Sequence, residues 1–188
     1  MGREDQIVNE RKRKLQELRK IVNPYPHRFE VKHYSDEIKK RYKLLKNNEQ
    51  TKNSVVIAGR VKTIRNLGKI LFATLQDGQG IIQIILQKNH TKQENFDLFK
   101  KYIDSGDFIG VEGNVMKTQT SEISILAKKI TVLSKSIYPL PEKWHGLKDN
   151  EERYRKRYLD LIMNPEVRNV FNKRTLILQL IREFLMKK

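Results

Sequence analysis

Three residues occupy outward positions in segments where apolar and polar residues alternate: Phe72, Gln83 and Glu122. Their side chains can stack on a flat polar ring or hydrogen-bond to its edge. Successive side chains of a strand point to opposite faces, so the apolar neighbours of each take the core and leave these three outside. An exposed aromatic ring offers stacking worth about 1–3 kcal/mol per nucleobase, and amide and carboxylate groups can read the edge of a base. A carboxylate repels phosphate, so Glu122 makes sense chiefly as an acceptor for a base N–H. These residues predict a site for an unpaired base.

A fourth residue, Arg65, could donate hydrogen bonds to a carbonyl or a phosphate beside this group. Strict alternation puts Arg65 on the same side as Val61, so it needs a β-bulge or the end of its strand to turn outward. For Phe72 the alternative is a packing contact with a helix or with the N-terminal segment. Because Phe72 occurs together with Gln83, Glu122 and Arg65, base binding is the favoured interpretation.

The charge of the chain points to the same kind of ligand. With 39 Lys and Arg against 22 Asp and Glu, the formal net charge is +17, which destabilises a compact state unless a polyanion binds. A lysine-rich proteome would also produce such a composition, so charge alone leaves both interpretations open. Contacts with a phosphate backbone are expected from five cations: Arg11, Lys12, Arg13, Lys14 and Lys69.

Composition and spacing exclude several classes of chemistry. The chain has no cysteine, which rules out disulfides, thiolate metal sites and cysteine nucleophiles. The histidines are scattered without metal-ligand spacing, so structural or solvent-exposed roles are expected for His27, His33, His90 and His145. A charged N-terminus and the lack of a long apolar run predict a cytoplasmic protein. We therefore expect no catalytic residue, no cofactor and no metal in this chain.

Changes in hydrophobic period predict the elements that position these residues. Helical spacing covers about Asp5–Ile21, and Ser35 has the side chain of an N-cap for a second helix that runs to Leu45. A period of two then begins and predicts five strands, at residues 55–64, 69–76, 81–87, 108–117 and 122–133. A helix at residues 93–103 falls between the third and fourth strands.

Five strands with a helix between the third and the fourth is the order of an OB fold. An SH3-like barrel also has five strands, but it lacks a helix at that point, so the OB fold is preferred. The predicted fold class is mainly β: a five-stranded OB-fold barrel with an N-terminal helical extension and a C-terminal helix. The corresponding regions are an extension at 1–52, the barrel at 53–134, a hinge at 135–164 and a final helix at 165–188.

Residues 58–84 closely resemble the anticodon-binding domain of class IIb aminoacyl-tRNA synthetases, which are the aspartyl, asparaginyl and lysyl enzymes. Arg65, Phe72 and Gln83 stand at the spacing of that family's motif. The resemblance implies that Phe72 stacks on the middle uridine of the anticodon. It also implies that Gln83, Arg65 and Glu122 hydrogen-bond to that uridine.

A second block resembles the lysyl enzymes in particular. Residues 133–147, with the stretch Lys-Trp-His-Gly-Leu around Trp144, and residues 150–162 are similar to the hinge of lysyl-tRNA synthetases. The basic segment 11–19 and the Pro-Tyr-Pro at 24–26 fit the N-terminal helix of that family and its end. The resemblance therefore covers nearly the whole chain, and Trp144 is expected to anchor the hinge by packing.

One departure from the family pattern concerns the hairpin before Glu122. The family usually has glycine at the preceding position, where this chain has Ser121. Serine tolerates a left-handed backbone poorly, so the turn could differ in type. Such a difference would shift Glu122 and leave Phe72 and Gln83 in place.

The resemblance implies an activity for a longer parent protein, a lysine–tRNA ligase. Lysyl-tRNA synthetases join lysine to ATP with Mg²⁺, transfer the lysyl group to tRNA(Lys) and are homodimers. This chain stops in an apolar helix that starts at Glu166, before the catalytic motifs, so we expect a fragment that binds tRNA(Lys) without catalysis. Three alternatives remain: a free-standing OB-fold protein that binds single-stranded nucleic acid, a domain of an aspartyl or asparaginyl enzyme, and a module that docks protein partners.

Overall fold

The computed structural model describes residues 2–141 and 149–187. The chain divides into two compact units, Met1–Pro139 and Leu140–Lys188. The first contains the sheet and the second contains three helices, so each unit is described by itself. Trp144 and His145 lie outside the described residues, and their expected roles stay predictions.

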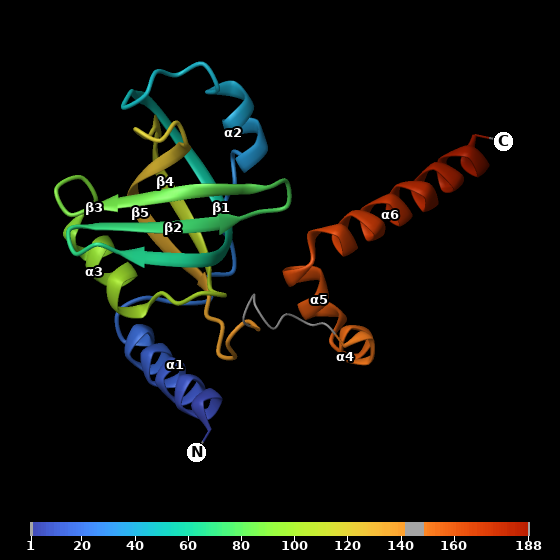
Figure 1. The fold of residues 1–188 in the computed structure, drawn as a ribbon, viewed down its shortest axis with the longest axis horizontal. Helices are drawn as coiled ribbons and strands as arrows, with labels where there is room; N and C mark the ends of the chain where they lie inside the picture. The colour runs from blue at the N-terminus through green and yellow to red at the C-terminus, as the bar shows by residue number, and fades with distance from the viewer. Residues whose placement is uncertain (1, 142–148, 188) are drawn as a thin grey trace. The chain divides into compact units, whose positions relative to one another are not determined.

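Five strands close into a barrel in the order β1-β2-β3-β5-β4 (Figure 1). Neighbouring strands are antiparallel except for β3 and β5, which are parallel. The helix α3, Gln93–Tyr102, connects β3 to β4, so the predicted mainly β, OB-fold class is confirmed. The strands are β1 Gln50–Asn66, β2 Ile70–Gln76, β3 Ile81–Gln87, β4 Phe108–Lys117 and β5 Ile123–Ser134.

The interior of the barrel is filled by the apolar half of each alternating strand. Leu71, Ala73 and Leu75 of β2 are buried, and so are Ile82 and Ile84 of β3. Burying one large aliphatic side chain contributes about 1.5–3 kcal/mol, and a slip of one residue would turn a whole apolar set outward. The core therefore determines the register, and the register determines which polar side chains face outward.

The strand β1 begins earlier than predicted, at Gln50 instead of Val55. Its first residues are polar and mostly exposed, but they pair with β4, Gln50 opposite Met116 and Ser54 opposite Asn114. Backbone pairing needs no apolar side chain, so alternation carried no signal for this part of the strand.

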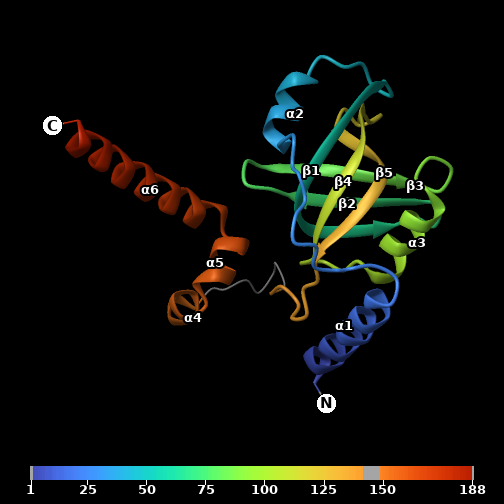
Figure 2. The ribbon, with the colours of Figure 1, turned by 180° about the vertical axis from the view of Figure 1, so that it is seen from behind.

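Two helices precede the barrel, α1 at Arg3–Arg19 and α2 at Ser35–Arg41, and they lie at opposite ends of it (Figure 2). The N-cap prediction for Ser35 is wrong, because the cap position belongs to Tyr34 and Ser35 is the first helical residue. The backbone N–H and the hydroxyl of Ser35 donate instead to Asp77, in the β2–β3 turn, at 2.6 and 2.7 Å. Those bonds attach the start of α2 to the sheet.

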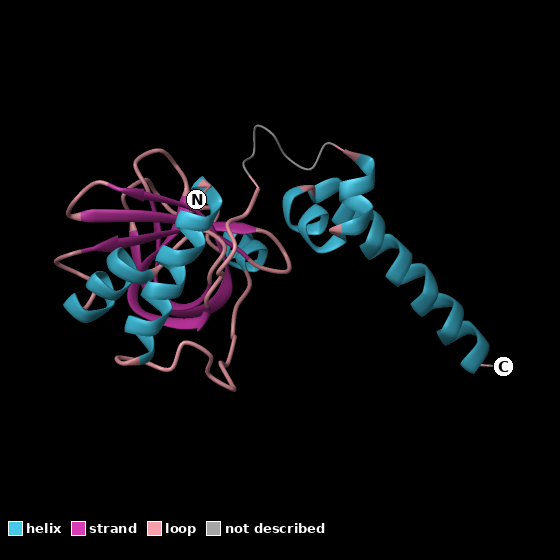
Figure 3. Ribbon diagram, turned by 90° about the horizontal axis from the view of Figure 1, so that it is seen from below, coloured by secondary structure: helices cyan, strands magenta, loops and turns pink. Residues whose placement is uncertain are grey.

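The helix α1 lies across one end of the barrel beside α3 (Figure 3). Its attachment centres on Arg11, which is only 8% exposed. The Arg11 guanidinium donates to the backbone carbonyls of Ser105, Ser136 and Tyr138 at 3.0, 3.0 and 3.2 Å. Three carbonyls from two distant segments therefore converge on one side chain of the helix.

A buried charge cluster lies beside these carbonyls. The ammonium of Lys135 is fully buried, donates to Asp107 at 2.6 Å and also donates to Asp104. Lys14 of α1 completes the cluster with a 2.7 Å ion pair to Asp104. Burial opposes the charge of Asp104, yet hydrogen bonds from Lys135 and Lys14 hold the pKa of that carboxyl below its usual value, whereas burial raises the pKa of Asp107. The ion pair of Lys14 with Asp104 thereby links α1 to this buried cluster.

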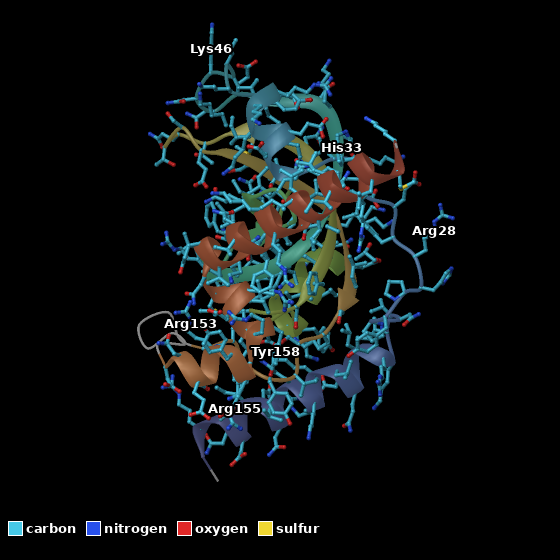
Figure 4. The ribbon with its side chains drawn as sticks, turned by 90° about the vertical axis from the view of Figure 1, so that its right-hand side faces the viewer. Arg28, His33, Lys46, Arg153, Arg155 and Tyr158 are labelled. Atoms are coloured by element: carbon cyan, nitrogen blue, oxygen red, sulfur yellow. The ribbon has the colours of Figure 1, made fainter. Side chains whose placement is uncertain are left out.

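The second unit consists of α4 Asn150–Arg155, α5 Arg157–Met163 and α6 Pro165–Met186. Arg153 of α4 donates to the buried carboxylate of Asp160 of α5 at 3.0 Å, and Asn164 donates to it at 2.6 Å. Arg153 and Arg155 on α4 and Tyr158 on α5 are labelled in Figure 4. The predicted final helix is confirmed as α6, and its apolar residues are largely exposed within this unit.

Candidate nucleic-acid interface

A groove of about 890 Å³ lies on the outer face of β1, β2 and β3, beside the β4–β5 hairpin. Sites that enclose small organic ligands typically measure a few hundred to about 1,000 Å³, so a nucleobase fits easily. All four residues predicted for base binding line this groove: Arg65, Phe72, Gln83 and Glu122. The structure thus brings together side chains from three strands and a hairpin.

A β-bulge turns Arg65 into the groove. The pairing of β1 with β2 shifts between Val61 and Thr63, which inserts one extra residue into β1. After the shift Arg65 lies opposite Phe72, and the hydroxyl of Thr63 donates to Thr74 at 2.8 Å. Of the two possibilities for Arg65, a bulge or the end of its strand, the structure contains the bulge.

The Phe72 ring lies on the open side of the sheet, half-buried against its neighbours. Ile85, opposite it on β3, is 3% exposed and forms part of the groove floor. The ring lines the groove and is left accessible at its surface, so it retains area on which a planar ligand can stack.

The amide of Gln83 is oriented by two neighbours. Its Nε2 donates to the Glu122 carboxylate at 3.1 Å, and its Oε1 accepts a hydrogen bond from the hydroxyl of Ser124 at 2.9 Å. Ser124 lies beside Gln83 in the parallel pairing of β3 with β5 and is buried. The burial of Ser124 and its role in orienting the amide appear only once β5 is paired with β3.

The hairpin that carries Glu122 keeps a left-handed residue in spite of the serine. Ser121 has φ 63°, and its hydroxyl donates to Asn47 at 3.0 Å. The Thr118 hydroxyl accepts from the backbone N–H of Glu122 at 3.0 Å, and the Thr118 N–H donates to the Glu122 carbonyl at 2.9 Å. These bonds hold Glu122 beside Gln83, so the serine does not displace the carboxylate from the groove.

The cations expected to contact a phosphate backbone have different environments. Arg11 is buried on backbone carbonyls and Lys14 is paired with Asp104, so both attach α1 to the barrel and neither faces solvent freely. Arg13 is exposed and forms ion pairs within α1. Lys12 and Lys69 are exposed. The spacing of residues 11–14 in the sequence does not indicate which of these cations are buried and which are exposed.

Other candidate groups have structural environments. His33 accepts a hydrogen bond from the Val56 N–H at its Nδ1, 3.1 Å away, and fixes the segment between α1 and α2 against β1. Burial lowers the pKa of His90, and its Nε2 has no hydrogen-bond partner among the described residues. Within the same described ranges, no group of three or more acidic, histidine or cysteine residues could hold a metal ion. None of the described helices is long and apolar enough to cross a membrane.

Residues 55–133 match the family described as the OB-fold nucleic acid binding domain. The barrel and its groove thus belong to a class of nucleic-acid-binding domains. The chain is also 46% identical to a lysine–tRNA ligase of Methanoculleus marisnigri over 93% of its length. It is 47% identical to the lysine–tRNA ligase of Pelotomaculum thermopropionicum over 98% of its length, and 47% identical to that of Lactococcus lactis over 93%. Over these lengths the chain is similar to lysyl-tRNA synthetases. It spans about a third of the length of these relatives, 34%, 36% and 36%.

Proposed function

We propose that the groove binds the anticodon of tRNA(Lys) and selects the middle uridine. The observation that supports this most directly is the hydrogen bond from Gln83 to Glu122 in the groove that Phe72 also lines. A base stacked on that ring would present its edge to an amide, a carboxylate and the guanidinium of Arg65.

The polar groups favour uridine over cytidine for a chemical reason. Uracil presents acceptor, donor and acceptor at O4, N3–H and O2, which complements a donor, an acceptor and a second donor from Gln83, Glu122 and Arg65. Cytosine presents a donor at N4 and an acceptor at N3, so two of the three positions would oppose like groups. A base stacked in the groove would cover these polar groups, and each covered group left unpaired costs about 1–3 kcal/mol, enough for a clear preference.

For the longer protein we propose the activity named for its relatives, the ligation of lysine to tRNA. In that protein ATP and Mg²⁺ would be used outside the barrel, a homodimer is expected, and the location would be cytoplasmic. The 188-residue chain alone is proposed to bind tRNA without catalysing aminoacylation. The regions proposed from the sequence, an extension, a barrel, a hinge and the start of a further domain, are kept in this proposal.

The proposal is tested by titrating the chain with an anticodon stem-loop that carries three uridines, and with the same stem-loop carrying cytidine at the middle position. We expect at least tenfold weaker binding of the cytidine loop, equivalent to about 1.4 kcal/mol. Both titrations are run over a range of salt concentrations, because the phosphate contribution falls with salt whereas edge recognition does not. Equal affinity for both loops at moderate salt would leave a non-selective single-strand binder as the better description.

A further inference from the structure

A second hollow lies on the other side of Glu122. It measures about 450 Å³ and is lined by residues of α2, of the turn after it and of the β4–β5 hairpin: Lys39, Lys43, Lys117, Ser121, Glu122 and Ile123. Glu122 lines both this hollow and the groove that contains Phe72. Three of its six lining residues are lysines, so we refer to it as the lysine hollow.

Two of the three ammonium groups are available to a ligand. Lys117 donates to the backbone carbonyls of Lys43 and Leu45 at 3.2 and 2.9 Å. The Lys117 ammonium thereby covers carbonyl oxygens just beyond the C-terminal end of α2. Without it, the partial negative charge of that helix end would repel an anion. Lys40 is paired with Asp36 at 2.7 Å. Lys39 and Lys43 have no ion-pair partner within the described ranges, so their ammonium groups are available to a ligand.

The hollow is held at a fixed place relative to the groove. The Asn48 N–H donates to the Lys117 carbonyl and the Lys117 N–H to the Glu49 carbonyl, both at 2.9 Å. Ser121 adds its bond to Asn47. The loop after α2, where Lys46 is labelled in Figure 4, is therefore tied to the hairpin that bears Glu122. A ligand that spans the groove and the hollow meets a single pre-formed surface.

We propose that Lys39 and Lys43 bind a backbone phosphate of the RNA strand whose unpaired base occupies the groove. This inference rests on the proposed function. The base and its phosphodiester are separated by one sugar, and Glu122 is the wall common to both hollows. A carboxylate at the base edge repels the nearby phosphates, and two lysine charges on its far side offset that repulsion. The lysine hollow thus makes a carboxylate tolerable inside an anion-binding surface.

The test couples a protein change with a change in the RNA. The variant Lys39→Gln with Lys43→Gln is compared with Lys100→Gln with Lys128→Gln, in which two exposed lysines outside both hollows are replaced and the net charge changes equally. Each protein is titrated with the three-uridine stem-loop and with copies that carry one uncharged methylphosphonate linkage at successive loop positions.

We expect one or two of the modified RNAs, each with a single uncharged linkage, to bind wild-type protein about tenfold more weakly than the unmodified RNA does. The control variant should show the same loss at the same linkages. We expect the Lys39/Lys43 variant to be weakened for the unmodified RNA, with a salt slope lower by about one, and to lose nothing further at those linkages. Equal sensitivity of all three proteins at every linkage would overturn the phosphate site. A failure of wild-type protein to prefer uridine would contradict the proposed function instead, since the linkage comparison does not depend on base identity.

Discussion

At the scale of single residues, Phe72 is the part of the proposed site that any base can use, because every base has a face to stack on. Replacing Phe72 by alanine is expected to weaken binding of the anticodon stem-loop by about 1–3 kcal/mol. The slope of log Kd against log salt should stay unchanged, since no phosphate contact is lost. Fluorescence titration at several salt concentrations measures both quantities.

The matched control is Phe72→Trp, which keeps an aromatic face in the groove and should retain most of the affinity. Because the ring is only half-buried, the alanine variant should keep most of its thermal stability. A variant that binds normally but melts much earlier would mean that Phe72 serves packing instead of base binding.

Ser121 shows how a local backbone preference is overruled by its surroundings. Its left-handed φ of 63° costs a residue with a Cβ about 1–2 kcal/mol, a penalty that glycine does not carry. Ser121→Ala keeps that penalty and loses the bond to Asn47. We therefore expect Ser121→Gly to be more stable than Ser121→Ala by about 1 kcal/mol in chemical unfolding. If the alanine variant were the more stable, the left-handed turn would be absent in solution.

At the scale of elements, two adjacent residues of α1 are predicted to have different roles, Arg11 in stability and Lys12 in RNA binding. Arg11→Ala removes a buried guanidinium from three carbonyls, so the barrel unit should lose about 1.5–3 kcal/mol of unfolding free energy. Lys12 is exposed, so Lys12→Ala should leave that free energy unchanged. It should instead weaken all RNAs alike and lower the salt slope by up to about one.

Each variant of this pair is the control for the other, because the same helix loses one cation in both. Urea unfolding and RNA titration are measured on both proteins. Normal stability of Arg11→Ala combined with weak RNA binding would reassign Arg11 to the RNA surface and contradict its buried position.

At the scale of the whole molecule, the net charge of +17 gives salt two opposite effects. Salt screens self-repulsion among the cations, so the melting temperature of the free chain is expected to rise by a few degrees between about 20 and 200 mM NaCl. The same change should weaken RNA binding by at least tenfold, because bound counterions compete with the protein. Thermal unfolding without RNA and titrations with RNA measure the two trends.

Osmotically matched sucrose is the control for the salt series, since it changes water activity without screening charge. A melting temperature that falls as salt rises would show that ion pairs, such as Lys135 with Asp107, outweigh the long-range repulsion.

The strand sequences by themselves determined the order of the barrel and its outward face. Leu71 and Leu75 are buried and Phe72 faces the groove as alternation predicts, because the direction of a side chain in a strand is a local property of the backbone. The helix between β3 and β4 was equally visible, since its apolar spacing is also local. Alternation left two possibilities for Arg65, a bulge or the end of the strand, and the structure contains the bulge.

Only the tertiary structure decided which polar groups are available to a ligand. Arg11 is followed along the chain by Lys12, yet its partners lie 94 to 127 residues away, and no spacing near residue 11 reveals them. The burial of Ser124, the turn at Ser121 and the lysine hollow likewise depend on contacts between distant segments. Backbone direction is set within a few residues, whereas burial and hydrogen-bond partners depend on segments that meet only after the barrel closes.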